Sequence, residues 1–307
     1  MGLPMARQAP AALVLGRGEW AVSAPTPGSP EWRRLITASK VATILNLAPW
    51  EGETPYLLWH RMRGNLPWGD ETRAMLRGSM LEDAVLDWWL VDHPGHTEVS
   101  RQPYYPLGDW AGATPDMLVT GPDGAPELVD AKTTGDGYAW ATEVPVYYFA
   151  SSQWQMACAP DVQRVHLAAL TGKPRFDLTS HVVERDDEVI AHIVRECRAF
   201  YDSLSGDTEP PLSNSPAEYE AIRTVHPDID PDEVAVLDDE LVDRYLGDIA
   251  HAERVPATKA RILQAMGRAR RAKSVAGQTI CRRQPKGDAV TLVRVAPIPE
   301  LDQETQP

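Results

Sequence analysis

Residues 111–132 read AGATPDMLVTGPDGAPELVDAK. Two strand-like segments, 111–120 and 126–132, flank the sequence Gly-Pro-Asp-Gly at residues 121–124. Glycine and proline at this spacing are typical of a tight turn. The two segments are therefore predicted to pair as an antiparallel hairpin.

The hairpin carries charged side chains at its centre. Asp116 lies on the first strand, and Asp130 and Lys132 lie on the second. Side chains alternate along a strand, so Asp130 and Lys132 point to one face and the turn brings Asp116 within reach of it. Nearby carboxylates repel unless a cation lies between them, and Mg²⁺ prefers oxygen ligands. The residues alone leave two interpretations open, a metal site and a pair of surface carboxylates.

Further elements on both sides of the hairpin predict a sheet covered by helices. Apolar residues recur at the spacing of helices or strands through most of the segment 30–208. Helices are predicted near 36–47, 55–63, 70–91, 146–158 and 186–204, and further strands near 97–105, 162–170 and 176–184. The order α-β-β-β-α-β-β-α around the hairpin indicates an α/β (α+β) fold, with a central mixed β-sheet flanked by helices.

Two of these helices carry polar side chains that could serve the hairpin. Glu82 lies on the apolar face of the 70–91 helix, where a carboxylate needs a partner or a metal. A salt bridge at the rim of the molecule is the other interpretation of Glu82. Gln153 and Gln155 on the 146–158 helix can position water or supply oxygen ligands.

Composition divides the chain into three parts. Residues 1–29 are rich in Ala, Pro and Gly and are predicted to be a flexible leader, followed by a core over 30–208. Residues 209–307 are predicted to hold a linker or irregular segment over 209–234, a basic helical extension within a helix-rich tail at about 236–273, and a terminal hairpin. The two strands of that hairpin are expected at 278–283 and 289–294.

Charge is strongly segregated along the chain. The net charge of −14 disfavours nucleic-acid binding when it is taken alone. Residues 182–252, however, contain 19 acidic and 5 basic residues, whereas residues 254–286 contain 10 basic and no acidic residues. The basic segment is either a solvated helix or a surface that contacts phosphate. The residues expected to contact the DNA backbone are Arg268, Arg270, Arg271 and Lys273.

Other residue types exclude several classes of protein. Cys158, Cys197 and Cys281 are widely spaced and odd in number, which argues against a disulfide framework and favours a reduced, cytoplasmic setting. No apolar run is long enough to span a membrane. The histidines, including His60, His93, His96 and His166, show no metal-ligand spacing, so the sequence predicts no histidine site.

Six ordered stretches between residues 30 and 170 resemble the PD-(D/E)XK nuclease superfamily, specifically the lambda-exonuclease/YqaJ-like phage recombination nucleases. The stretches are Trp32-Arg33-Arg34 followed by Ile36-Thr37-Ala38-Ser39, then Thr54-Pro55-Tyr56 with Trp59, Arg77-Gly78 with Glu82, Thr114-Pro115-Asp116, Asp130-Ala131-Lys132, and Ser152-Gln153-Trp154-Gln155. The resemblance implies a restriction-endonuclease-like core with a helical C-terminal extension. Asp130 stands where this family more often has glutamate, and the superfamily accepts both.

The resemblance also implies a role for each matching residue. The direct ligands of Mg²⁺, for which Mn²⁺ may substitute, would be Asp116, Asp130 and the carbonyl oxygen of Ala131. The residues implied for catalysis are Lys132, Glu82 and Gln153, with Glu82 acting through water. Ser39 and either Arg33 or Arg34 would bind the 5′-phosphate of a DNA strand.

The function implied is a metal-dependent 5′-to-3′ exonuclease that acts on double-stranded DNA and leaves single-stranded 3′ tails for phage-type recombination. Such an enzyme is expected to be a homo-oligomer in the host cytoplasm, with a single-strand annealing protein as partner. One alternative is an endonuclease, or a CRISPR-adaptation-like nuclease, which usually has a cysteine cluster that this chain lacks. A catalytically inactive DNA-binding protein is the other alternative, against which Asp116, Asp130 and Lys132 argue.

Overall fold

The chain divides into two compact units, Met1–Asp228 and Ile229–Pro307. The computed structural model describes residues 24–135, 137–140, 143–173, 176–213, 215–225, 234–286 and 289–295. Most of the predicted leader, residues 1–23, lies outside these described residues. Among the helices that the structure describes, none has the length and apolar character needed to cross a membrane.

The elements of each unit follow in chain order. The first unit contains α1 (Pro30–Arg34), α2 (Ala38–Ile44), α3 (Pro55–Arg63), α4 (Arg73–Asp92), β1 (Thr97–Arg101), β2 (Tyr105–Leu107), β3 (Ala111–Ala113), β4 (Met117–Thr120), β5 (Pro126–Thr134), the 3₁₀ helix Tyr138–Trp140, α5 (Val146–Cys158), β6 (Arg164–Thr171), β7 (Asp177–Glu184), α6 (Asp187–Ser203) and α7 (Pro216–Val225). The second unit contains α8 (Asp239–Met266), β8 (Arg271–Lys273), β9 (Thr279–Lys286) and β10 (Ala289–Arg294).

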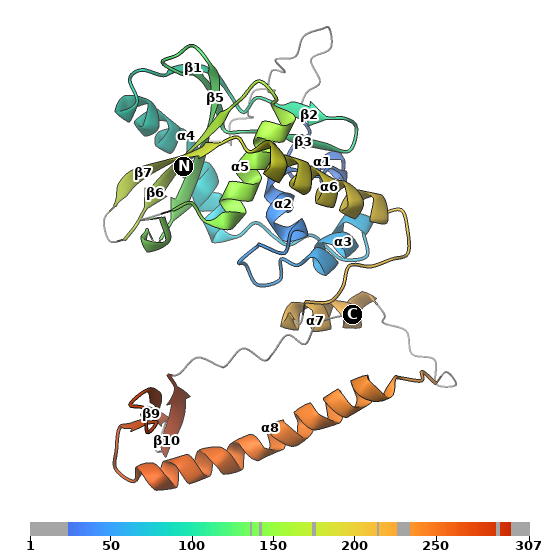
Figure 1. The fold of residues 1–307 in the computed structure, drawn as a ribbon, viewed down its shortest axis with the longest axis vertical. Coiled ribbons are helices and arrows are strands. Elements are labelled where there is room, and N and C mark those ends of the chain that lie inside the picture. The colour runs from blue at the N-terminus through green and yellow to red at the C-terminus, as the bar shows by residue number, and fades with distance from the viewer. Residues whose placement is uncertain are drawn as a thin grey trace, which may run out of the picture. The chain divides into compact units, whose positions relative to one another are not determined.

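A five-stranded sheet with the strand order β1-β4-β5-β6-β7 forms the centre of the first unit (Figure 1). Strands β5 and β6 run parallel, and the other neighbouring pairs run antiparallel. Helix α5 connects the two parallel strands, because parallel neighbours need a crossover rather than a tight turn. The mixed sheet flanked by helices that the sequence predicts is confirmed.

Strands β4 and β5 form the hairpin predicted from the sequence. Met117 lies opposite Val129 across the pair. In the turn, the N–H of Gly121 donates to the carbonyl oxygen of Ala125 at 2.8 Å, and Gly124 has a φ of 82°. That left-handed conformation is readily adopted only by glycine. The turn therefore fixes which residues of the two strands face each other.

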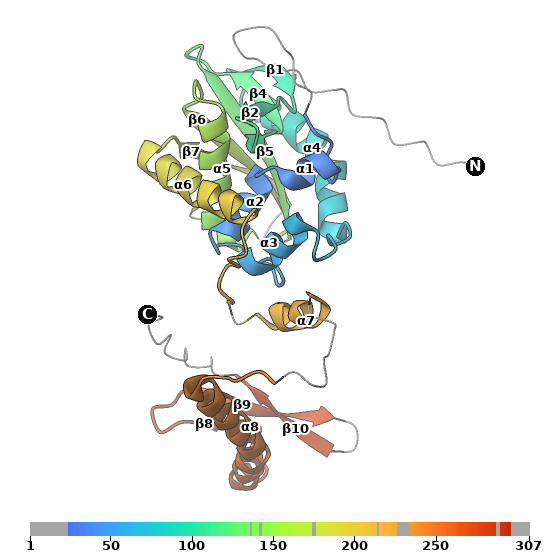
Figure 2. The same ribbon diagram turned by 90° about the vertical axis from the view of Figure 1, so that its right-hand side faces the viewer.

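Helices cover both faces of the central sheet (Figure 2). The core under α4 contains Val85, Leu86, Trp89, Met117, Val119 and Val129. The core on the opposite face, under α5 and α6, contains Leu128, Met156, Val165, Leu167 and Ile190. Successive side chains of a strand point to opposite faces. Val129 therefore lies under α4, whereas Asp130 lies on the face that α5 covers.

The predicted strands at 97–105 and 111–120 are each interrupted. The breaks separate β1 from β2 and β3 from β4. Gln102 has a φ of 50°, and Pro115 lacks the N–H that continued pairing requires. Strands β2 and β3 instead form a separate two-stranded sheet. Asp116 therefore lies where the chain enters the central sheet.

The segment 209–234 contains a helix where the sequence analysis expects a linker or irregular chain. The buried carboxylate of Glu218 accepts hydrogen bonds from the N–H and the hydroxyl of Ser213, at 2.8 and 2.9 Å. Ala221 packs against Tyr56 and Leu57 of α3. These contacts attach α7 to the first unit, so that unit extends beyond residue 208.

The second unit combines a long helix with a three-stranded sheet in the order β10-β9-β8. Strands β9 and β10 pair antiparallel in the region where the terminal hairpin is expected. Within the helix-rich tail expected at about 236–273, α8 stops at Met266. Gly267 follows with a φ of 49°, a backbone conformation that glycine adopts more readily than other residues. Arg271 and Lys273 therefore lie on a strand.

Candidate active site

Backbone hydrogen bonds fix the position of Asp116. Its carbonyl oxygen accepts a hydrogen bond from the N–H of Gln102 at 2.9 Å. Its side-chain Oδ2 accepts another from the N–H of Ala131 on β5, at 2.7 Å. The carboxylate of Asp116 therefore lies across the hairpin, against the segment from Asp130 to Lys132.

The ammonium of Lys132 draws together oxygen atoms of two neighbouring residues. Its Nζ donates to Oδ2 of Asp130 and to the carbonyl oxygen of Ala131, the latter at 3.1 Å. Burial lowers the pKa of Lys132, but the charges of Asp130 and Asp116 outweigh burial and raise this pKa above its usual range. Lys132 therefore stays charged at neutral pH, and it can offset negative charge but cannot accept a proton.

The two carboxyl groups differ in their tendency to ionise. Burial, together with the negative charge of Asp130, raises the pKa of Asp116 well above its ordinary value. Burial also opposes ionisation of Asp130, but Lys132 and a hydrogen bond from Gln155 outweigh it and lower the pKa of Asp130. Without a further cation, the pair carries one negative charge readily and the second only at a cost.

Helix α5 presents Gln155 to these carboxylates. Nε2 of Gln155 donates to Oδ1 of Asp130 at 3.0 Å, while its buried Oε1 has no hydrogen-bond partner among the described residues. The amide of Gln153 instead bonds the carbonyl oxygen of Glu184 and the N–H of Asp186, at 2.7 and 3.0 Å. Gln155, and not Gln153, therefore contacts Asp130, because residues two apart on a helix point in roughly opposite directions.

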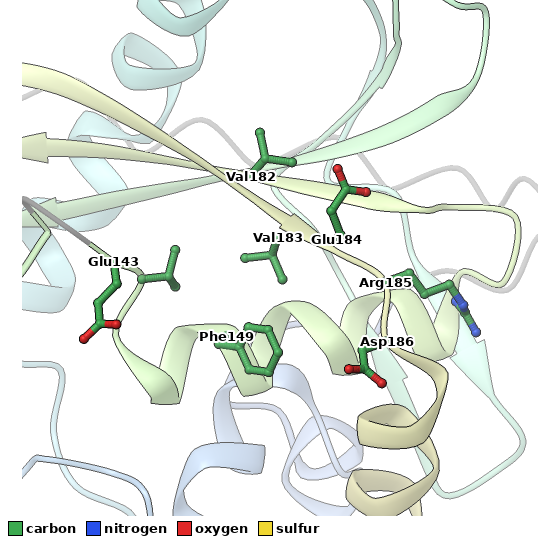
Figure 3. A pocket seen from close by; sticks show the side chains of 8 residues that line it. Glu143, Phe149, Val182, Val183, Glu184, Arg185 and Asp186 are labelled. Carbon is green, nitrogen blue, oxygen red and sulfur yellow. The ribbon is translucent and has the colours of Figure 1, made fainter.

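Next to Gln153 lies a hollow between α5, β7 and the start of α6 (Figure 3). Figure 3 shows the carboxylates of Glu143, Glu184 and Asp186 around it, while the guanidinium of Arg185 extends away. A rim with this excess of negative charge repels phosphate. The hollow is therefore a poor path for DNA, and the hairpin remains the better candidate for phosphate chemistry.

Glu82 approaches the site from α4. Nε2 of Gln102 donates to Oε1 of Glu82 at 3.0 Å, and Glu82 forms no ion pair with the other described residues. Gln102 therefore joins Glu82 to Asp116, whose backbone it also contacts. Burial and the charge of Asp130 are the main causes that raise the pKa of Asp116, and the charge of Glu82 raises it further. The sequence analysis missed Gln102, because only the break between β1 and β2 places it there.

The donor set fits a hard divalent cation. Asp116, Asp130 and the carbonyl of Ala131 offer only oxygen atoms, which Mg²⁺ prefers. The ammonium of Lys132 already bonds two of these oxygens, so they are arranged to receive a positive charge. The orphaned Oε1 of Gln155 could accept a hydrogen bond from water held by such an ion.

The predicted phosphate-binding residues Arg33, Arg34 and Ser39 are exposed at the junction of α1 and α2. The hydroxyl of Thr37, which precedes α2, lies 3.1 Å from that of Ser39 and makes no hydrogen bond to a backbone N–H of the helix. The backbone N–H groups at the start of α2 therefore have no side-chain cap. All of these donors could face an anion.

A buried lysine, which the sequence analysis missed, supports this junction. Nζ of Lys40 donates to the carbonyl oxygens of Trp32, Arg33 and Leu35, at 2.9, 3.2 and 2.5 Å. The ring of Trp32 lies 4.2 Å from the same nitrogen. Because the ammonium of Lys40 donates hydrogen bonds to the last carbonyl oxygens of α1, it holds Arg33 and Arg34 at the turn between α1 and α2.

Helix α5 connects the junction with the carboxylates. The hydroxyl of Ser151 donates to the carbonyl oxygen of Ala38 in α2 at 3.1 Å. Ser151 precedes Gln155 by four residues, so both side chains lie on one face of α5. One helix face therefore contacts both α2, which carries Ser39, and the carboxylate of Asp130.

The four basic residues predicted to contact the DNA backbone lie in the second unit. Arg268 and Arg270 precede β8, and Arg271 and Lys273 lie on it; all four are exposed. None of them forms an ion pair with another residue that the structure describes. Arg271 lies opposite Arg282 on β9, where like charges repel. An anion bound here would relieve that repulsion.

Residues 31–164 match the family model described as the YqaJ-like viral recombinase domain. This range contains Asp116, Asp130, Lys132 and Gln155. These residues of the first unit are therefore similar to a YqaJ-like viral recombinase domain. The resemblance inferred from the sequence is confirmed over these residues. No curated protein matches the chain.

Several solved structures resemble the chain. The alkaline exonuclease LHK-Exo from Laribacter hongkongensis is 22% identical with a TM-score of 0.44, over 63% of this chain and 95% of that chain. The same exonuclease in complex with dAMP is 23% identical with a TM-score of 0.45, over 63% and 94% of the two chains. A phage-related exonuclease from Haemophilus somnus 129PT is 12% identical with a TM-score of 0.42, over 55% and 94%.

Replacing either carboxylate of the YqaJ-like domain is expected to change its stability in opposite directions. In metal-free protein, Asp116→Asn should raise the midpoint of thermal unfolding, because the neutral amide removes a charge that burial disfavours and still accepts from Ala131. Asp130→Asn should lower the free energy of unfolding by about 2–3 kcal/mol, because it leaves Lys132 without its anion.

Both changes in stability, which differ in sign, are expected to depend on pH. Because the pKa of Asp116 is raised in the folded protein, its carboxyl group costs the fold nothing below the ordinary pKa of an aspartate. The cost grows as pH rises from that value to the raised pKa and is complete above it. The gain from Asp116→Asn should therefore shrink as pH falls. The loss from Asp130→Asn should also shrink, because the native carboxylate is itself protonated at low pH. Thermal melts in chelator at a series of pH values measure the change in stability of both variants. Stabilisation by Asp130→Asn would contradict the ion pair between Asp130 and Lys132.

Gln155 and Gln153 are expected to respond differently to substitution by leucine. Gln155→Leu should weaken binding of Mn²⁺, measured by calorimetry, by at least about tenfold, because it removes an outer partner of Asp130. Gln153→Leu should leave that affinity unchanged and lower the free energy of unfolding by about 2–3 kcal/mol, because a backbone N–H and a carbonyl lose their partners. The reverse pattern would place Gln153 at the metal.

Proposed function

We propose that this chain is a metal-dependent exonuclease that digests one strand of linear double-stranded DNA from its 5′ end and leaves a single-stranded 3′ tail. One observation carries the proposal. Oxygen atoms of Asp130 and Ala131 converge on the charged Lys132, beside the carboxyl group of Asp116, whose pKa is raised. The YqaJ-like viral recombinase family of residues 31–164 supports the same activity.

The site suits hydrolysis of a phosphodiester. A bound Mg²⁺ ion would polarise the phosphate and lower the pKa of an attacking water. Asp116, Asp130 and the Ala131 carbonyl would hold the ion, and Lys132 would stabilise negative charge that develops on the phosphate. Gln155, through its free Oε1, and Glu82 would orient water at the reacting phosphorus.

The direction of digestion rests on the junction of α1 and α2. Arg33, Arg34 and Ser39 would bind a terminal 5′-phosphate together with the free backbone N–H groups of α2. Ser151 and Gln155 on α5 tie this junction to Asp130. A phosphate bound there would set the position of the scissile bond relative to the carboxylates, so that positioning contributes to the rate.

The basic segment of the second unit would hold the duplex without regard to sequence. Exposed arginines that lack ionic partners can replace the counterions of DNA phosphates. The chain is expected to act as a homo-oligomer with a single-strand annealing protein that receives the 3′ tail. An endonuclease and an inactive DNA-binding protein are the outcomes that the first experiment distinguishes.

That experiment digests linear duplexes that carry a 5′-phosphate or a 5′-hydroxyl, each labelled at one end, with Mg²⁺ and with chelator. Wild type should release label from the 5′ end, only with Mg²⁺ and faster from the phosphorylated end. Lys132→Ala should lower the rate at least about 100-fold while duplex binding persists, because the lysine acts on developing charge.

Three variants and a closed substrate serve as controls. Arg33→Ala, Arg34→Ala and Ser39→Ala should each reduce the preference for a 5′-phosphate without abolishing cleavage. Cleavage of closed circles would identify an endonuclease, and release from 3′ ends would overturn the direction. Binding without any cleavage by wild type would indicate an inactive DNA-binding protein.

Neutralising the basic segment is expected to flatten the salt dependence of duplex binding. Replacing Arg268, Arg270, Arg271 and Lys273 by glutamine should reduce the slope of log affinity against log salt by about 0.9 for each DNA phosphate that is no longer neutralised. Fluorescence anisotropy over a range of salt concentrations measures the slope. Arg223→Gln with Arg244→Gln is the matched control, because these exposed arginines pair with Glu220 and Glu240. An equal change in both sets of variants would contradict a specific role for the segment.

A further inference from the structure

A second cluster of titratable groups lies on the sheet face that α4 covers. His96 precedes β1, Glu127 lies on β5 and His166 lies on β6. Their side chains are 11%, 3% and 8% exposed, respectively. The sequence predicts no histidine site, because 70 residues separate the two histidines along the chain. Pairing of the strands of the sheet brings these distant residues close together in space.

The three side chains are close enough to share one ion. Their candidate ligand atoms all lie within 4.8 Å of one another. Oε2 of Glu127 lies 3.1 Å from Nε2 of His96 and 2.6 Å from Nε2 of His166. Ligands of a tetrahedral Zn²⁺ ion, bound at about 2.0–2.2 Å, stand roughly 3.3 Å apart. A small rotation of His166 away from Glu127 would bring the contact between these two residues to this spacing.

The charges around the cluster favour a divalent cation. Arg164 contacts the three carboxylates of Glu127, Asp123 and Glu184, at 2.9, 3.4 and 3.2 Å. Three negative charges therefore surround one positive charge. Burial lowers the pKa of His166, so its imidazole is neutral at pH 7 and has the form that coordinates metals. A divalent ion would balance the local excess of negative charge.

Aromatic rings enclose the cluster. The indole of Trp89 lies 4.9 Å from the ring of His96 and 5.0 Å from that of His166, measured between centroids. His93 stacks on the same indole at 4.1 Å, and its ring centroid is 5.8 Å from that of His96. His93 is thus a nearby further imidazole. A mostly buried site with apolar walls excludes water and strengthens a metal–ligand interaction.

We propose that His96, Glu127 and His166 bind a structural transition-metal ion, for which Zn²⁺ is the best fit, and that this ion fastens the start of β1 to β5 and β6. Imidazole nitrogens prefer Zn²⁺ over Mg²⁺, whereas the oxygen ligands around Asp116 prefer Mg²⁺. The proposal does not depend on the proposed nuclease function. The competing arrangement is a hydrogen-bonded network without metal, in which both imidazoles donate to Glu127.

The test measures Zn²⁺ binding to the full chain, stripped with chelator, in the presence of excess Mg²⁺. Wild type should bind about one Zn²⁺ ion per chain by calorimetry, and Zn²⁺ should raise the midpoint of thermal unfolding. Asp116→Asn should bind Zn²⁺ as wild type does, because it alters only the other site. His96→Ala and His166→Ala should each weaken Zn²⁺ binding by at least about 100-fold and remove the thermal shift.

His192→Ala is the matched control, because His192 is an exposed histidine of α6 outside the cluster, and it should retain full Zn²⁺ binding. Circular dichroism checks that each variant folds. If His166→Ala does not fold, the more exposed His96→Ala decides, and the wild-type titration decides without any variant. Absence of Zn²⁺ binding by wild type in excess Mg²⁺, or unchanged binding by His96→Ala, would overturn the proposal and leave the hydrogen-bonded network.

Discussion

The repulsion between the carboxyl groups of Asp116 and Asp130 is the constraint on which the arrangement of the first unit depends. Ionising both groups away from bulk water requires positive charge nearby. Lys132 supplies one such charge to Asp130, and a hydrogen bond from Ala131 supports Asp116. The pKa of Asp116 is raised despite these contacts, so the side chains of the protein do not fully offset the negative charge of the two carboxylates. In the proposed function, this unbalanced negative charge would give the site its affinity for a cation.

The hairpin and its two flanking helices share the task of holding these groups. The turn at Gly121–Gly124 sets the register, so that Asp116 meets the backbone of β5. Helix α5 contributes Gln155 from one face, and α4 contributes Glu82 near the edge of the other. The large apolar cores on both faces of the sheet make this possible, because they supply the stability that buried charges do not.

Strand β5, which carries Asp130, also carries Glu127 of the cluster with His96 and His166. Glu127 and Asp130 are three residues apart on β5 and therefore point to opposite faces of the sheet. One strand can thus serve an oxygen-rich site under α5 and an imidazole-rich cluster under α4. If both proposed sites bind metal, their different donor atoms would favour different ions.

The sequence by itself determined the hairpin, the bounds of α5 and the grouping of Asp116, Asp130 and Lys132, because turn chemistry and side-chain alternation act over a few residues. It also indicated the family through short ordered motifs. Only the tertiary structure decided that Gln155 rather than Gln153 meets Asp130, because the rotation of a helix about its axis is set by packing. Packing also placed Lys40 beneath α1, Gln102 beside Glu82 and α7 on α3. The histidine cluster depends on strand pairing between segments far apart in the chain, which no local pattern of residues records.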